Sequence, residues 1–213
     1  MPRIICLELY IKLHNQNKGV VKFMKKILVL MMVLLLVSSC TVFAAEGYFN
    51  AKLGLDLAGN HDLDYEEGGS GDFDVDTGFT IAGEYLVPYN AKVDFGAGLA
   101  YQFERGFDED VDSSDFKFNF IPLYGIMKYK LDKAYLLGQL GYNFFDLSKE
   151  YEDGGDAEGG LYYGLGAGMN FSENIFAEIL YSVNKGEINY DEDDDYGSEV
   201  DNSQISLMLG YKF

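Results

Sequence analysis

Residues 205–213 read ISLMLGYKF, and this stretch decides the expected fold. Large apolar residues occupy every second position up to Phe213, and Ser, Met, Gly and Lys stand between them. A period of two is typical of a β-strand, because successive side chains of a strand point to opposite faces of the sheet. The stretch therefore predicts a strand with one continuous apolar face.

The same alternation occurs seven more times before this stretch. It begins at Phe49, where Phe49, Leu53 and Leu57 share a face and Asn50 and Lys52 lie on the other. The later strands are expected at about 78–86, 91–104, 116–131, 134–145, 160–171, 175–184 and 202–213. Short turns at 87–90, 132–133 and 172–174 alternate with long acidic segments at 58–77, 105–115, 146–159 and 185–201. This alternation predicts an all-β fold, an eight-stranded antiparallel up-and-down barrel that crosses a membrane with its apolar face toward lipid.

The fourth of these strands breaks the pattern. Phe118 and Phe120 share one parity, whereas Leu123 and Met127 have the other. The change falls at Ile121-Pro122, and proline cannot donate a hydrogen bond to a sheet ladder. We therefore expect a β-bulge at this point.

A secretory leader precedes the first strand. Met24-Lys25-Lys26 is a basic head, 27–37 is apolar, and small residues follow up to Ala45. This layout predicts a signal-peptide helix at 24–44, cleaved after Ala44. A membrane anchor and a lipoprotein signal with Cys40 as the lipidated residue are the alternatives. Residues 1–23 are interpreted as an upstream extension from a start site placed too early, and 45–213 as the barrel domain.

The composition excludes several classes of function. Asp and Glu number 35 against 16 Lys and Arg, for a formal net charge of −19. Phosphate binding needs clustered Lys and Arg, so no nucleic-acid partner is expected. Cys6, His14 and Cys40 all precede the barrel domain, which leaves it no cysteine and a single histidine, His61. We therefore expect no catalytic residues and no zinc site, and no enzyme activity.

Two segments carry a resemblance to a known group of proteins. The alternation of Leu207, Leu209, Tyr211 and Phe213 looks like the C-terminal assembly signal of outer-membrane barrels. The run IPLYG at 121–125, followed by Lys128-Tyr129, is similar to a strand that these families often carry. Residues 45–213 as a whole resemble the small eight-stranded barrels of the OmpA, OmpX, OmpW and opacity-protein type.

This resemblance implies a place in the cell outer membrane. The expected partners are the lipid around the barrel, the barrel assembly machinery that reads the last strand, and an extracellular partner of the loops. Both ends of the barrel domain are expected on the periplasmic side. The alternative is a soluble, lipocalin-like barrel, in which the apolar face would point inward.

Five charged residues are expected to face the lumen in the half of the barrel near the short turns. They are Lys52, Glu84, Asp94, Lys128 and Glu178. Buried charges must pair, so an ion-pair plug that closes the lumen is expected. A gated constriction of a small porin-like channel is the alternative. Inward glycines such as Gly98, Gly166 and Gly168 allow two interpretations. They admit large neighbours, including Tyr135, Tyr162 and Phe176, or they leave a cavity for a small apolar ligand, as in an OmpW-like binder.

The long segments are acidic, and two groups of aspartates in them are candidate cation ligands. These are Asp72, Asp74 and Asp76, and Asp191, Asp193 and Asp195. Carboxylate oxygens suit Ca²⁺ or Mg²⁺, so weak divalent binding is one interpretation and a solvated, mutually repelling surface the other. No other cofactor is expected. The sequence thus favours a non-enzymatic surface, structural or adhesion-type membrane protein, with the channel and the apolar-ligand binder as alternatives.

Overall fold

The computed structural model describes residues 47–65, 70–106, 117–147, 156–189 and 197–213. Contacts divide the chain into Met1–Val42 and Phe43–Phe213, and every described residue belongs to the second unit. The predicted upstream extension and signal peptide therefore lie outside the described residues. Within those ranges, no helix has the length and apolar character needed to cross a membrane.

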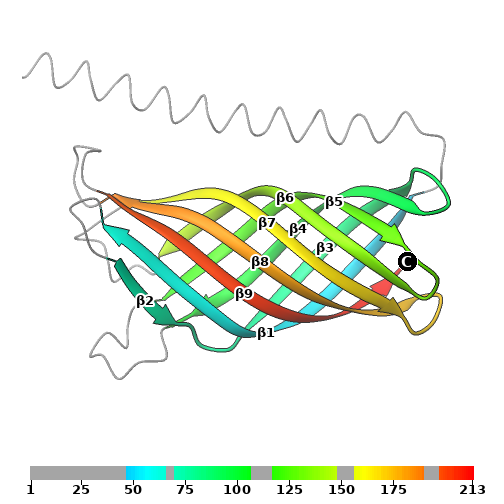
Figure 1. The fold of residues 1–213 in the computed structure, drawn as a ribbon, viewed down its shortest axis with the longest axis horizontal. Coiled ribbons are helices and arrows are strands. Elements are labelled where there is room, and N and C mark those ends of the chain that lie inside the picture. Colours follow the sequence, from blue (N-terminus) through cyan, green and yellow to red (C-terminus); the bar gives the residue numbers. More distant parts are fainter. Residues whose placement is uncertain (1–46, 66–69, 107–116, 148–155, 190–196) are drawn as a thin grey trace, which may run out of the picture. The chain divides into compact units, whose positions relative to one another are not determined.

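The described unit is a closed antiparallel barrel (Figure 1). Each strand pairs with the next along the chain, and β1 also pairs with β9, which closes the sheet. The strands are β1 Tyr48–Tyr65, β2 Ser70–Asp74, β3 Gly78–Pro88, β4 Val93–Arg105, β5 Phe118–Lys130, β6 Ala134–Leu147, β7 Asp156–Asn170, β8 Ile175–Asn189 and β9 Gly197–Lys212. Closure leaves no unpaired sheet edge inside the bilayer, where no water could satisfy it.

The segments β2 and β3 are two parts of one barrel strand. Asn60 pairs with Asp74 on β2, and Asp56 pairs with Gly78 on β3, in a single unbroken register along β1. The Val75 N–H also donates to the Gly59 carbonyl across the interruption. The nine segments therefore make eight barrel strands, and the predicted strand number and fold class are confirmed.

The strands near the long loops reach further than the sequence pattern predicted. Residues 58–65, 70–74, 185–189 and 197–201 were expected in loops and are strands. The ladder continues to Tyr65↔Ser198 and Asn189↔Gly197, although the outward side chains there are polar. Beyond the apolar outer face, the outward side chains are polar, so the alternation of apolar and polar residues ends there. The backbone hydrogen bonds between the strands nevertheless continue.

The short turns join the opposite ends of the strands, at 89–92, 131–133 and 171–174. The first begins two residues later than predicted, because the Asn90 side chain accepts hydrogen bonds from the N–H groups of Lys92 and Val93. The Phe213 N–H donates to the Phe49 carbonyl, so the start and the end of the barrel lie at this turn end.

The bulge predicted at Ile121-Pro122 is wrong. The register of β5 against β6 is unbroken from Phe118↔Leu147 to Lys130↔Tyr135. Buried side chains alternate along the whole of β5, so Phe118 and Phe120 face the lumen. The apolar residues of β5 change parity because its lumen-facing residues are charged near the short turns and apolar near the long loops. Register shifts occur instead between Asp56 and Ala58, Gln102 and Arg105, and Gly159 and Tyr162.

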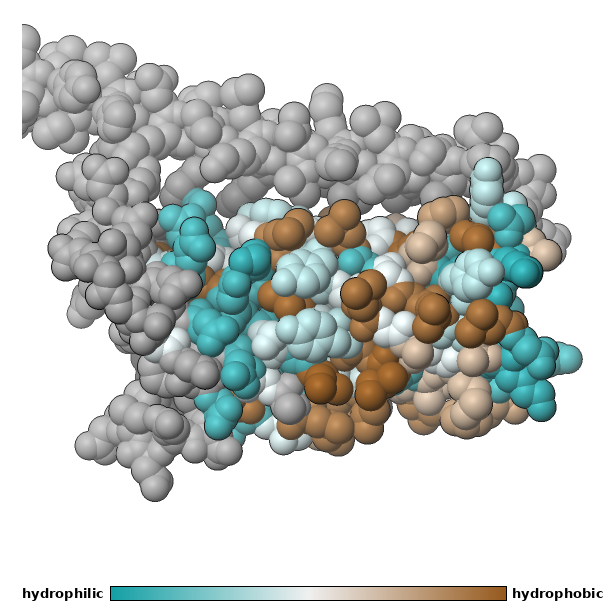
Figure 2. Space-filling model, in the orientation of Figure 1, coloured by the Kyte–Doolittle hydropathy of each residue, from teal (hydrophilic) through white to brown (hydrophobic). Residues whose placement is uncertain are grey.

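The outer face of the barrel is apolar. Exposed large residues form rows of about nine positions along the chain, for example from Phe49 to Leu57 on β1 and from Ile205 on β9 to the terminal Phe213. Figure 2 shows them as a hydrophobic band between hydrophilic ends. Such rows match the length of strand that a tilted bilayer crossing needs. The lipocalin-like alternative, which requires the opposite orientation of the faces, is wrong.

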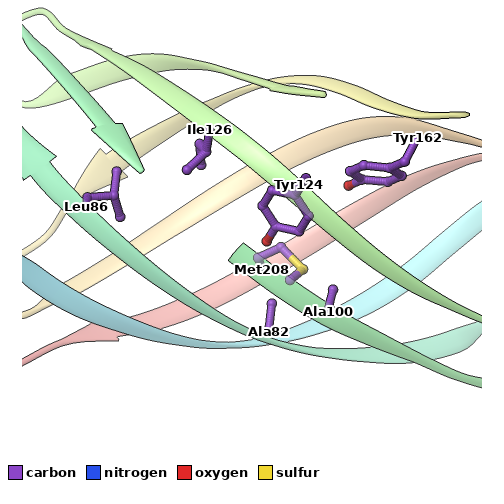
Figure 3. Close-up of a cluster of buried hydrophobic side chains, with 7 residues drawn as sticks. All are labelled: Ala82, Leu86, Ala100, Tyr124, Ile126, Tyr162 and Met208. Carbon is purple, nitrogen blue, oxygen red and sulfur yellow. The ribbon is translucent and has the colours of Figure 1, made fainter. Parts of the chain in front are cut away.

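Large aromatic side chains fill much of the lumen. Tyr124, Tyr162 and Met208 lie in one buried cluster with Ala82, Leu86, Ala100 and Ile126 (Figure 3). A Cβ added at Gly168 would lie 2.3 Å from the Tyr135 ring, and one at Gly98 would lie 2.6 Å from the Tyr124 ring. These two inward glycines therefore admit large neighbours.

Candidate functional site: the layers of the lumen

Four charged side chains meet inside the barrel. The Lys52 ammonium donates to Glu84 Oε1 and, at 2.9 Å, to Glu178 Oε2. Lys128 Nζ lies 2.7 Å from Glu178 Oε1 and 3.4 Å from Glu84 Oε2. The residues come from β1, β3, β5 and β8, so the pairs reach across the lumen, and their side chains are at most 5% exposed. We call these residues the charge cluster.

Neutral groups donate further hydrogen bonds to the charge cluster. The Tyr135 hydroxyl donates to Glu178 Oε1 at 2.7 Å, and the Tyr124 hydroxyl donates to Glu84 Oε1 at 3.1 Å. Lys128 Nζ lies 4.9 Å from the centre of the Tyr135 ring, within cation–π range. Buried ions lose hydration, and only such dense pairing offsets that loss.

The fifth charged residue of the predicted set, Asp94, lies apart from the other four. Its carboxylate accepts a hydrogen bond of 2.7 Å from the Tyr48 hydroxyl and pairs with Lys130 at 2.7 Å. The structure thus brings together Lys52, Glu84, Lys128 and Glu178 but not Asp94. The prediction missed Lys130, although its parity on β5 is the same as that of Lys128.

A second polar layer lies further along the strands and was also missed. Asp56 accepts hydrogen bonds from the Thr80 hydroxyl at 2.7 Å and the Ser206 hydroxyl at 2.5 Å. Arg105 is buried and its guanidinium donates to Gln204 Oε1. The inward parity of Asp56 was visible in the sequence. The inward direction of Arg105 was not visible in the sequence, because the register shift between Gln102 and Arg105 moves this side chain onto the inner face.

An apolar layer fills the lumen near the long loops. Phe120 stacks on Phe145 with ring centroids 4.9 Å apart, and Phe118 contacts Phe120 edge-on at 5.6 Å. The buried members of this layer, which we call the mouth cluster, are Val75, Phe118, Phe120, Phe145, Ile188 and Val200. Burial of this apolar surface provides a second, chemically different filling of the barrel.

Acidic side chains follow the apolar rows on the outside of the loop end. Glu158 on β7 is the cross-strand partner of Glu187 on β8, which is in turn the partner of Glu199 on β9. We call the acidic residues of this region the acidic collar, and they include Asp74, Asp76, Glu158, Glu187, Glu199 and Asp201. Lys185 offsets part of their charge through a 2.6 Å contact with Asp201.

A family profile described as "Outer membrane protein beta-barrel domain" matches residues 32–213. The chain belongs to this family. The protein is therefore an outer-membrane β-barrel, in agreement with the closed sheet and its apolar outer face. No curated protein matches the chain.

Solved structures of outer-membrane barrels also match this family member. The attachment invasion locus protein Ail of Yersinia pestis is 18% identical with a TM-score of 0.47, covering 79% of this chain and 99% of its own. Neisserial surface protein A is 17% identical with a TM-score of 0.49, covering 78% and 97%. The N-terminal barrel domain of Pseudomonas aeruginosa OprF is 14% identical with a TM-score of 0.34, covering 79% and 100%. At these sequence identities and TM-scores, the matches give no information on the ligand or the role of this chain.

The candidate cation ligands are only partly visible in this outer-membrane barrel. Asp74 and Asp76 are exposed, Asp72 is described by its backbone alone, and Asp191, Asp193 and Asp195 lie outside the described residues. Among the described side chains, no group of three or more His, Cys, Asp or Glu is placed to hold a metal ion. Weak binding of Ca²⁺ or Mg²⁺ at the acidic segments stays a prediction.

Proposed function

We propose that this protein is a non-enzymatic surface protein of the outer membrane, with a closed lumen and a contact surface on its acidic loop end. The observation that carries the proposal is the charge cluster, in which Lys52 and Lys128 each contact both Glu84 and Glu178. A barrel of eight strands has an interior just wide enough for side chains to fill.

The closed lumen is supported by two layers of different chemistry. An ion that crossed the charge cluster would have to separate pairs buried in a medium of low dielectric constant, which is costly. It would then have to pass Phe118, Phe120 and Phe145 without hydration. Each layer alone opposes ion passage, and the two lie at different depths of the same lumen.

The acidic collar supports a contact role with a cationic partner. Like charges directly opposite one another on neighbouring strands destabilise a sheet. The carboxylates in this row, Glu158, Glu187 and Glu199, therefore repel one another. A positively charged partner would offset the repulsion and be attracted to the row. We assign the loop end to the outside of the cell and the turn end, with both ends of the barrel domain, to the periplasm.

The closed lumen can be tested by osmotic swelling of liposomes that contain the purified protein. We expect no swelling above protein-free liposomes in isosmotic glycine or arabinose. Folding is checked in the same sample by the shift in gel migration on heating. Swelling by the folded protein would contradict the closed lumen and favour the porin-like channel, which the uncharged polar residues of the lumen, such as Asn184 and Asn202, would suit.

The contact role can be tested by binding of the protein in lipid nanodiscs to immobilised polylysine. We expect retention at low salt that weakens in the double variant Glu187→Gln/Glu199→Gln and falls with ionic strength. The double variant Asp132→Asn/Glu173→Gln is the matched control, because both residues are exposed in turns at the opposite end of the barrel. Equal losses in the two proteins, or no retention of the parent, would overturn the contact role.

A further inference from the structure

The turn end of the barrel differs in charge from the acidic loop end. In the whole chain, acidic residues outnumber basic ones by 35 to 16. The turn end departs from this ratio, because the charged residues described there are Lys92, Lys130, Lys133 and Lys212 with Asp94, Asp132 and Glu173. The placement of these individual charges therefore decides what this end can bind.

Two neighbouring turns bring three of these lysines together. The turn at 89–92 joins β3 to β4, the turn at 131–133 joins β5 to β6, and β4 pairs with β5. The Lys130 N–H donates to the Lys92 carbonyl at 2.6 Å, so the two turns are linked by a backbone hydrogen bond. Lys133 follows in the second turn, which the Leu131 N–H closes by donating to the Ala134 carbonyl at 2.9 Å.

Only two of the three lysines are available to an external partner. Lys130 pairs at 2.7 Å with the buried carboxylate of Asp94, so the charges of these two residues balance. Lys92 and Lys133 are exposed, and Asp132 is the one acidic residue of their two turns. This part of the turn end therefore keeps a net positive charge. We call Lys92 and Lys133 the lysine pair.

The lysine pair lies where the apolar outer face ends. Tyr89 and Phe95, whose ring centroids are 5.8 Å apart, flank one of its members in the sequence, and Tyr129 and Leu131 precede the other. All four of these apolar or aromatic side chains are exposed. Since lipid hydrocarbon covers the apolar rows, the lipid headgroups lie at their edge, where tyrosine rings and lysine side chains are typical.

From this arrangement we propose that the lysine pair binds the headgroups of anionic phospholipids in the leaflet at the turn end. An ammonium group attracts a phosphate as a point charge, without a fixed geometry, and a phospholipid with a net negative charge gains most from it. Such a lipid contacts the lysine pair with its headgroup and Phe95 or Leu131 with its hydrocarbon chains, whereas a soluble acidic protein would contact the charges alone. The inference goes beyond the proposed function, because it concerns the opposite end of the barrel.

The test measures which lipids the purified, folded protein selects from a bilayer. The protein is placed in phosphatidylcholine vesicles at low ionic strength with a trace of spin-labelled phosphatidylglycerol or spin-labelled phosphatidylcholine. Electron paramagnetic resonance then gives the fraction of each labelled lipid that the protein immobilises. We expect a preference of about twofold for phosphatidylglycerol, which disappears in Lys92→Gln/Lys133→Gln. The preference of the parent should also fall in high salt.

Lys117→Gln/Lys185→Gln is the matched control, because it removes the same charge at the loop end, where the acidic collar already repels anionic headgroups. This variant should keep the preference of the parent. Equal losses in the two double variants would overturn the inference. No preference in the folded parent would also overturn it and would point to an acidic soluble partner instead. Retention on polylysine concerns the loop end alone, so failure of the contact role is distinguishable from failure of this inference.

Discussion

The two halves of the lumen each contain a layer of opposite chemistry, the charge cluster near the turns and the mouth cluster near the loops. Near the turns, Lys52, Lys128, Glu84 and Glu178 form a buried ion-pair network. Near the loops, phenylalanine rings such as Phe120 pack against other apolar side chains. The comparison teaches that a narrow barrel needs no single kind of interior, because either ion pairing or apolar packing can occupy its cross-section. The two halves should respond differently when one member is removed.

The largest effect is expected for Lys52→Met. The substitution removes a positive charge that compensates the buried carboxylates of Glu84 and Glu178. Removal of one partner of a buried ion pair lowers the free energy of unfolding by about 3–5 kcal/mol. Urea unfolding from lipid vesicles measures the loss. The combined variant Lys52→Met/Glu84→Gln, which removes one charge of each sign, should recover a large part of it. A loss that persists in the combined variant would contradict charge imbalance as the cause.

A somewhat smaller loss, about 3 kcal/mol, is expected for Phe120→Ala, because it creates a cavity beside Phe145 in the mouth cluster. The same unfolding experiment applies, repeated in high salt. Salt should leave the difference in stability between the parent and this variant unchanged, since the substitution removes no charge. Stability within experimental error of the parent would show that the mouth cluster is not packed as described.

An intermediate loss is expected for Gly168→Ala. The added Cβ would meet the Tyr135 ring, which cannot move freely because its hydroxyl is bonded to Glu178. Overpacking of this kind costs about 1–3 kcal/mol. Gly138→Ala is the matched control, because its nearest neighbour would be 3.7 Å away, at ordinary contact distance. Equal stability of the two variants would contradict the tight packing of the turn half.

The smallest effect is a gain, expected for Glu187→Gln on the outside of the barrel. The substitution relieves repulsion with its partners Glu158 and Glu199 and should stabilise by about 0.2–1 kcal/mol at low ionic strength. The gain should shrink in salt, since exposed charges are screened. Destabilisation at low salt would show that Glu187 makes a favourable contact that the row of like charges does not explain.

Much of the fold could be predicted because the bilayer imposes a pattern of period two. The apolar rows from Phe49 to Leu57 and from Ile205 to Phe213 follow directly from lipid contact. The strands beyond them could not be predicted, because residues such as Glu187 and Glu199 are held by backbone hydrogen bonds and carry no apolar face.

The site could be predicted in one half of the lumen only. Charged residues at inward positions, such as Lys52 and Glu178, are conspicuous against an apolar background. Phe118 and Phe120 are as apolar as residues that face lipid, so their inward direction was misread as a bulge at Pro122. Arg105 was missed because a register shift, which no local pattern indicates, turns it inward.

The central claim is that two independent layers close the lumen, and single-channel recording in planar bilayers tests it most directly. Four proteins are compared: the parent, Lys52→Ala, Phe120→Ala and the double variant, each shown to be folded by heat-dependent gel migration. We predict a silent parent and steady conductance steps only in the double variant, because each single variant leaves one layer in place. Steady, ion-selective steps from the folded parent would contradict the claim.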